Sequence, residues 1–203
     1  GKITLIGTES GVGVRNAGVI GASAGDIVLQ SDGWLTNSGS IQASAAGNTQ
    51  ISTAGDVTNS GTIYATGNTN IKARGNISIS GLVAAQNHAM VLADGATSRV
   101  DATASAVLAS GLNSNGTLGS VGDLQVQSST RVAIQGKTRS VGNTNITSGQ
   151  LDLSGATISG SDLALNAKNG DLNTAHAMVT SQGMLTAQTP KMWRTDNANI
   201  TAN

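Results

Sequence analysis

Apolar and polar residues alternate in short runs along the whole chain. In residues 76–80 (NISIS) and 151–154 (LDLS), Ile or Leu alternates with Asn, Ser or Asp. A period of two places the apolar side chains on one face of a strand and the polar ones on the other. No long window shows the spacing of three and four residues that an amphipathic helix needs. The pattern therefore predicts short β-strands throughout.

The short strands belong to a repeat. Residues 34–41 (WLTNSGSI) return as residues 56–63 (DVTNSGTI), an offset of 22 positions, and weaker copies begin at Asn16 and Ile79. Further copies share a Gly-Asn-Thr, Gly-Asp or Ser-Asp entrance to an apolar run, at residues 25–29, 47–51, 67–71, 122–126, 142–146 and 161–165. Recurrence at a near-constant period indicates stacked repeats rather than an ordinary globular domain.

A parallel β-helix accounts for both observations. A strand of a few residues is unstable alone, but stacked coils give every strand a partner above and below. Gly and Asn recur between the strands, where turns need conformations that larger residues resist. With strands about 4.8 Å apart, we predict an all-β, right-handed parallel β-helix (solenoid) of about nine or ten coils, roughly 45 Å long. This fold is expected to form a single segment over residues 1–203.

Two places depart from the repeat. Residues 94–120 contain two loop-like stretches rich in Gly, Asn and Ser, and we expect a coil that carries a loop excursion there. Residues 102–109, between these stretches, are rich in Ala and allow a helical turn. Pro190 cannot donate a hydrogen bond to a strand ladder, so we expect a corner or an outward bulge around it.

Composition narrows the range of functions. Eleven Lys and Arg balance eleven Asp and Glu, so no overall electric field attracts nucleic acid. The absence of Cys excludes disulfides and thiolate ligands, and no apolar run approaches the ~20 residues of a membrane helix. The chain does not begin with a signal peptide, and we expect it to be an internal piece of a longer protein.

Catalysis is the main alternative to a structural role, because many parallel β-helices act on polysaccharides. Such enzymes need two or three carboxylates gathered on one face. Several carboxylates instead follow Gly at strand entrances, where they can accept turn N–H bonds: Asp26, Asp56, Asp123 and Asp171. Asp152 and Asp162 could meet on neighbouring coils, but no Arg or Lys lies close to them in sequence to complete a site.

A serine-hydrolase motif and a histidine metal site are also disfavoured. Residues 21–25 (GASAG) match a nucleophile elbow, but strand-like runs flank them, whereas that elbow needs a strand and a helix. His88 and His176 begin near copies (HAMV) about four coils apart, or roughly 19 Å, too far to share one metal ion. We therefore interpret the two histidines as residues of a repeated turn, and we expect no enzymatic activity, no cofactor and no metal site.

One local cluster of positive charge is a candidate binding surface. It consists of Arg131, Lys137 and Arg139, and Arg99 joins it if the loop excursion folds back. Such a cluster can bind sulfated or acidic glycans, and the alternative is an ordinary solvated face. Trp34 and Tyr64 lie in neighbouring repeats and would form a small aromatic step if both pointed outward. Packing at coil corners is the alternative for these two rings.

The repeat units resemble those of filamentous haemagglutinins and contact-dependent growth-inhibition exoproteins, which bacteria export by two-partner secretion. The resemblance rests on Asn-Ser-Gly-x-Ile at Asn37 and Asn59, on Gly-Asp-Ile/Leu units at Gly25, Gly122 and Gly170, and on residues 108–116 (LASGLNSNG). Each motif is weak alone, but their order and spacing cover nearly the whole chain. The conserved secretion domain and a toxin-like C-terminal domain are not apparent.

The resemblance implies a shaft segment of a large secreted surface protein, which projects a distal binding or toxin-bearing region. It also implies an outer-membrane transporter as the partner during export, and a host or neighbouring cell as the target. A glycan- or receptor-binding adhesive module is the second hypothesis, and a polysaccharide-degrading enzyme is the third. We further expect the isolated segment to associate end to end, because its terminal strands have free edges.

Overall fold

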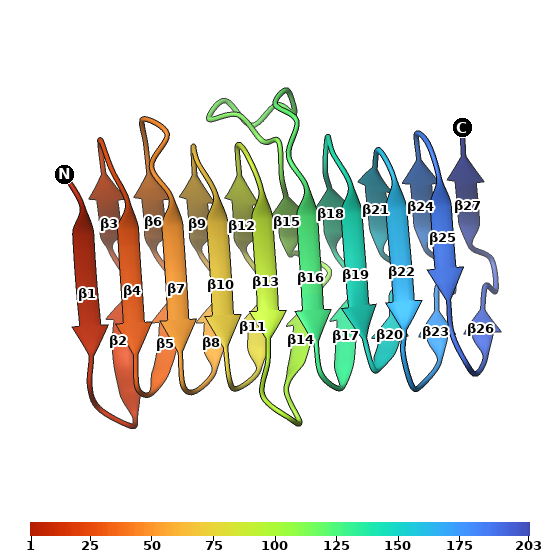
Figure 1. The fold of residues 1–203 in the computed structure, drawn as a ribbon, viewed down its shortest axis with the longest axis horizontal. Coiled ribbons are helices and arrows are strands. Elements are labelled where there is room, and N and C mark those ends of the chain that lie inside the picture. Colours follow the sequence, from red (N-terminus) through yellow and green to blue (C-terminus); the bar gives the residue numbers. More distant parts are fainter.

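The chain folds into a three-sided rod made of parallel strands (Figure 1). The computed structural model describes residues 1–203, except for the side chain of Val12. The described residues form 27 strands and no helix, so none of their elements is a helix long and apolar enough to cross a membrane. The strands make three parallel sheets of nine strands each, named here sheets A, B and C.

Each coil contributes one strand to each sheet. Sheet A contains β1 (Ile3–Gly7), β4 (Ile27–Ser31), β7 (Thr49–Thr53), β10 (Thr69–Ala73), β13 (Ala89–Ala93), β16 (Leu124–Ser128), β19 (Thr144–Ser148), β22 (Leu163–Ala167) and β25 (Leu185–Gln188). Sheet B contains β2 (Val12–Asn16), β5 (Trp34–Asn37), β8 (Val57–Asn59), β11 (Ile77–Ile79), β14 (Arg99–Ala102), β17 (Arg131–Ile134), β20 (Gln150–Asp152), β23 (Leu172–Asn173) and β26 (Trp193–Arg194). Sheet C contains β3 (Val19–Ala22), β6 (Ser40–Ala43), β9 (Thr62–Ala65), β12 (Leu82–Ala85), β15 (Val107–Ala109), β18 (Lys137–Arg139), β21 (Thr157–Gly160), β24 (Met178–Ser181) and β27 (Asn199–Ala202).

The path of the chain is right-handed. In Figure 1 the strands of sheet A run downward at the front and those of sheets B and C run upward behind, while the coils advance from the N- to the C-terminus. The predicted fold class is therefore confirmed. The rod has nine coils, which agrees with the expected nine or ten. The predicted copies are also in register, since Leu35 pairs with Val57 and Ile41 with Ile63.

The core is a set of stacked aliphatic rows. The central inward row of sheet A is fully buried and consists of Leu29, Ile51, Ile71, Val91, Val126, Ile146 and Leu165. Sheets B and C contribute similar rows, in which most Ile, Leu and Val side chains lie on another aliphatic side chain from the next coil. Burying one such side chain contributes about 1.5–3 kcal/mol, which compensates for the shortness of each strand.

A polar row is buried at the corner between sheets B and C. Asn37 is fully buried, and its Nδ2 donates to Asn59 Oδ1 at 2.7 Å and to the Thr62 carbonyl at 3.1 Å. Asn16 donates to Asn37 Oδ1 at 2.8 Å in the same way. The repeated Asn-Ser-Gly motif therefore serves the fold, because stacked amides satisfy one another and the carbonyls of the turn.

The coil of β13, β14 and β15 carries the loops expected at residues 94–120. A short loop, residues 94–98, joins β13 to β14, and a long excursion, residues 110–123, joins β15 to β16. Between them the chain is regular. The helical turn allowed at residues 102–109 is absent: β14 ends at Ala102, a turn follows, and β15 begins at Val107. Parallel partners on both sides fix these residues as strands, which overrides the helical preference of Ala.

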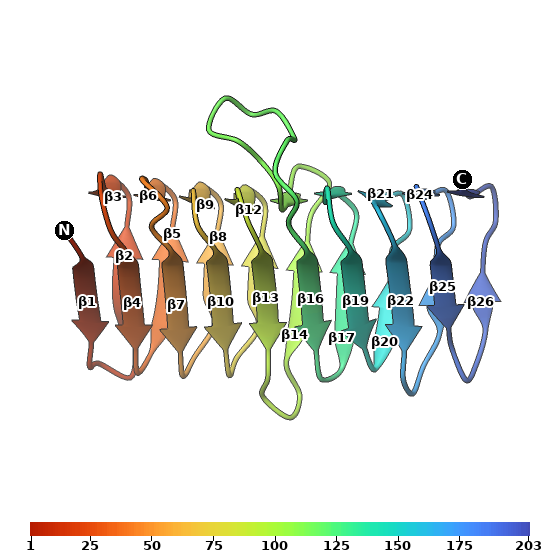
Figure 2. The ribbon, with the colours of Figure 1, turned by 45° about the horizontal axis from the view of Figure 1, so that its top comes forward.

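The excursion explains why sheet C loses its alternating pattern beneath it. Figures 1 and 2 show the excursion projecting from the rod and bending toward the N-terminal coils. The outward-facing Ala84 and Ala109 are buried, and Leu82 is partly buried. The apolar runs of β12 and β15 therefore pack against the core on one face and are covered on the other face.

Candidate functional surfaces

The aspartates at strand entrances belong to a hydrogen-bonded ladder along the rod. One residue of each coil lies at the entrance to sheet A, and its side chain accepts a hydrogen bond from the backbone N–H of the equivalent residue in the next coil. The accepting side chains are those of Asp26, Asn48, Asn68, His88 and Asp123, and Asn143 is the last donor. The donor–acceptor distances are 2.8–3.1 Å. Hydrogen bonds from the backbone and side-chain amides of Asn48 lower the pKa of Asp26. Asp26 and Asp123 therefore have a structural function, as their position after Gly predicted.

The two histidines do not occupy equivalent turns, contrary to the sequence prediction. His88 precedes β13 in sheet A, where its Nδ1 accepts the Asp123 N–H at 3.1 Å and takes the place of an Asn in the ladder. His176 lies between β23 and β24, with a positive φ of 58°. Insertions between the two copies shift the second one to a different corner. Across the described residues, no group of three His, Cys, Asp or Glu could hold a metal ion.

The predicted basic cluster is divided between two sheets. Arg131 lies on β17 in sheet B, whereas Lys137 and Arg139 lie on β18 in sheet C. Both residues of β18 are exposed on its outer face, and the intervening Thr138 points inward. Arg99 reaches the cluster by strand register and not through a loop, since it pairs with Arg131 on the neighbouring strand. Lys137 and Arg139 therefore share one face, and Arg99 and Arg131 share another.

Arg131 is engaged with a carboxylate that the sequence did not connect to it. Its guanidinium nitrogen lies 2.7 Å from Asp152 Oδ2, one coil away, and Asp152 Oδ1 accepts a bond from Ser154 Oγ at 2.8 Å. Partial burial acts to raise the pKa of Asp152, but the bonds from Ser154 and Arg131 outweigh it and lower the pKa. Asp152 thus has an Arg partner despite the distance in sequence. Asp162 is separate, because it lies at the entrance to sheet A and accepts the Met184 N–H.

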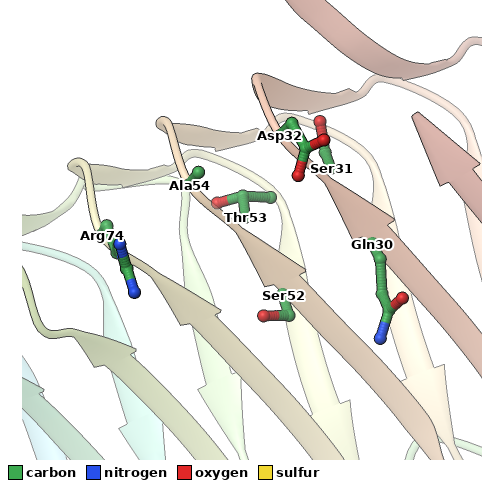
Figure 3. A pocket seen from close by; sticks show the side chains of 7 residues that line it. All are labelled: Gln30, Ser31, Asp32, Ser52, Thr53, Ala54 and Arg74. Carbon is green, nitrogen blue, oxygen red and sulfur yellow. The ribbon is translucent and has the colours of Figure 1, made fainter. Parts of the chain in front are cut away.

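An open hollow of about 350 Å³ lies along the corner between sheets A and B. Figure 3 shows Asp32 and Arg74 at its two ends, with Ala54 between them on the intervening coil. The small side chains of Ser52 and Ala54 leave the space unfilled. The hollow contains one carboxylate and no histidine, so it lacks the paired groups that acid–base catalysis needs.

The two aromatic rings proposed as a step lie on different faces. Trp34 begins β5 in sheet B and is 49% exposed, whereas Tyr64 lies on β9 in sheet C. The Tyr64 hydroxyl donates to the carbonyl of Leu112 in the excursion at 3.0 Å, and burial raises the pKa of Tyr64. No pattern in the sequence indicated this contact, because 48 positions separate the two residues.

The chain is similar to segments of two much longer toxins. It is 40% identical over 202 residues, 100% of its length, to a protein named toxin CdiA from Yersinia pestis. It is 37% identical over 202 residues, 99% of its length, to the tRNA nuclease CdiA-2 of Burkholderia pseudomallei strain 1026b. The chain spans 6% of the length of each relative. No protein-family model matches the chain, and no solved structure matches it significantly.

The similarity to both relatives extends over the whole solenoid and its repeated motifs. The name of the Burkholderia protein assigns an enzymatic activity to that protein as a whole. The absence of such activity in this chain stays a prediction. Both similarities cover the full set of coils, including the motifs at Asn37, Asn59 and Gly122. The predicted resemblance is therefore confirmed, because a β-helical chain with these relatives fits the repeat region of contact-dependent growth-inhibition and filamentous haemagglutinin-type exoproteins.

Proposed function

We propose that this chain is a shaft segment of a large bacterial exoprotein that carries a toxic or adhesive region away from the cell. The parent protein is secreted to the cell surface through an outer-membrane transporter of the two-partner type. The segment itself catalyses nothing and binds no cofactor. Its mechanism is mechanical, because the length of a solenoid is the number of coils multiplied by the spacing of strands.

The continuity of the three sheets is the observation that carries this proposal. All nine coils contribute to every sheet, and the two loops of the β13–β15 coil leave the ladders unbroken. Apart from the bond between Tyr64 and Leu112 of the excursion, the ladders join each coil to its two neighbours, so coils can be added or removed while the other coils keep their sequence. A rod with this property suits a spacer whose length varies between proteins.

Inserted coils test the proposal. Thr49 pairs with Thr69 across one full coil, so extra copies of residues 49–68 placed after Asn68 should continue every ladder. We expect the maximum dimension of the chain in solution scattering to rise by about 4.8 Å per copy. The parent exoprotein with the same insertions should still be exported and should still inhibit contacting cells.

A shuffled version of residues 49–68 is the matched control, because it keeps the composition and length but loses the inward alternation. It should lower the amount of exported parent protein, since the ladders and the core row are interrupted. The shaft proposal fails if the true copies leave the rod length unchanged, or if they reduce export as much as the shuffled copies do.

A second candidate function is weak binding of acidic glycans by Lys137 and Arg139. Both side chains are exposed on one face of β18, and neither makes an ion pair with a described residue. Retention on a heparin column should fall in the double variant Lys137→Ala, Arg139→Ala. Lys168→Ala is the control, because it removes one exposed charge from a different corner. Equal retention of both variants would discard this function.

A further inference from the structure

A notch lies where the excursion overhangs sheet C. It has a volume of about 130 Å³ and is open to solvent on one side. Its floor is the outer face of β6, β9 and β12, and its wall is the beginning of the excursion. The lining residues are Gln42, Thr62, Tyr64, Leu82, Leu112, Asn113, Ser114 and Gly116.

Strand register holds the floor of the notch rigid. Gln42 and Tyr64 are paired on adjacent coils, and Thr62 is paired with Leu82, so the four outward side chains form a small grid. The hydrogen bond from the Tyr64 hydroxyl to the Leu112 carbonyl fastens the wall to the floor. Two backbone hydrogen bonds hold Asn113. Its N–H donates to the Thr117 carbonyl at 2.8 Å, and the Asn113 carbonyl accepts the Gly116 N–H at 2.9 Å. The site is thus preformed.

The chemistry of the lining selects for an uncharged ligand with hydroxyl groups. No Asp, Glu, Lys or Arg lines the notch. The ring of Tyr64 and the side chain of Leu82 offer apolar surface, and both are partly exposed. Among the described residues, no hydrogen bond involves the side chains of Gln42, Thr62 or Ser114. An aromatic face flanked by one free amide, Gln42, and by free hydroxyls suits a pyranose ring, which has an apolar face and a polar rim.

We propose that this notch binds one neutral pyranose residue of a glycan. Its volume is below the ~300 Å³ at which pockets begin to enclose drug-sized ligands, so it accommodates a single ring and leaves the rest of the glycan in solvent. The ring stacks on Tyr64, and the Gln42 and Asn113 amides bind its hydroxyls. This recognition is separate from the shaft function and from the charged pair on β18.

The single tyrosine of the chain makes the site directly observable. With ring-labelled tyrosine, the chain gives one set of aromatic signals, all from Tyr64. The probes are methyl glucoside, methyl galactoside, methyl mannoside and N-acetylglucosamine, each titrated through the millimolar range, with glucuronic acid as the charged comparison. We expect at least one neutral sugar to shift the Tyr64 signals saturably, and glucuronic acid to bind more weakly than that sugar.

Two variants decide whether the shift comes from the notch. Gln42→Ala removes an exposed side chain without a described hydrogen bond, so the fold should persist while sugar affinity falls about fivefold, as for one lost neutral hydrogen bond. Trp34→Ala removes the exposed ring on sheet B and should leave the affinity unchanged. The proposal fails if no neutral sugar shifts Tyr64, if Gln42→Ala binds as tightly as the parent chain, or if leucinamide binds better than every sugar.

Discussion

The effect of a buried threonine hydroxyl on the stability of the rod depends on whether the hydroxyl has a hydrogen-bond partner. Thr69 is fully buried, and its hydroxyl donates to the Ala84 carbonyl at 2.7 Å. Thr138 is equally buried in sheet C, between Leu108 and Ile158 of the adjacent coils, but its hydroxyl has no partner among the described residues. An unpaired buried hydroxyl has lost its bond to water and gained nothing in return.

Thr138→Val should therefore stabilise the rod. Valine has the same shape, continues the aliphatic row and removes the unpaired group, so we expect a gain of about 1 kcal/mol in the free energy of unfolding. Thr69→Val is the matched control and should lose about 1 kcal/mol, because its hydroxyl is bonded. Urea denaturation of the three proteins measures both changes, and a loss of stability in Thr138→Val would contradict the expectation.

Asp152 should stabilise the rod in a pH-dependent manner. Its pKa in the folded chain is lowered from the ordinary 3.8, so the folded state favours the charged carboxylate. The contribution is complete above the unfolded pKa and is lost as the pH falls through the lower folded value. Asp152→Asn should thus lower the melting temperature at neutral pH and have a smaller effect well below pH 3.8.

Asp196→Asn is the control for this pH series. The side chain of Asp196 is 72% exposed, and its nearest cationic partner, Arg194, lies 3.8 Å away. Exposed pairs of this kind contribute little to stability. A melting-temperature difference for Asp152→Asn that stayed constant across the pH range would refute the role of its charge.

At the scale of elements, the excursion is an insertion into an otherwise standard corner. Three residues connect sheet C to sheet A after Ser140, and the same corner in the preceding coil holds residues 111–123 after Ser110. Both serines are buried at the same interior position. The deletion of residues 112–121 would leave Ser110-Gly111-Gly122-Asp123, which matches Ser140-Val141-Gly142-Asn143.

The deletion should preserve the fold. Asp123 would still accept the Asn143 N–H, so the ladder at the entrance to sheet A remains. We expect a loss of about 1–2 kcal/mol, because the outward faces of Leu82 and Ala84 lose their cover. Circular dichroism should remain that of parallel strands, and the sugar-dependent shift of Tyr64 should disappear. Unfolding of the shortened chain would show that the excursion is essential to the solenoid.

At the scale of the whole molecule, both end coils expose apolar groups and unpaired strand edges. Leu5 lies in an inward row beside Leu29, yet it is 40% exposed because no coil precedes β1 in the structure. At the other end Met184 and Trp193 are exposed. Since the two ends differ in shape, contacts between them are head-to-tail and do not close.

The isolated chain should consequently form end-to-end assemblies as its concentration rises. We expect a mean mass in light scattering that increases with concentration, and rods in electron micrographs that lengthen without thickening. Leu5→Lys should suppress assembly by placing a charge in the end interface. Ile6→Lys, on the outward face of the same strand, should suppress it less. A chain that stays monomeric at every concentration would rule out this behaviour.

The sequence alone determined the solenoid and most of its register. Alternation of period two places Ile, Val and Leu inward, and the near-constant interval between copies brings like residues into contact. The Asn37 and Asn59 copies pair as predicted. These features are local and repeated, and each coil contributes to the same pattern.

Only the tertiary structure decided the contacts at the coil where the number of residues between successive repeat copies changes. Thr69 pairs with Ala89, but Ala89 pairs with Leu124 across the long insertion. That insertion takes up part of the interval between His88 and His176, which lie at different corners, and it lays the excursion over Tyr64. Arg131 meets Asp152 across one ordinary coil of 21 positions. Side chains on neighbouring coils meet through the register of the stack, and an insertion changes the interval for every pair that spans it while the alternating pattern along the chain stays the same.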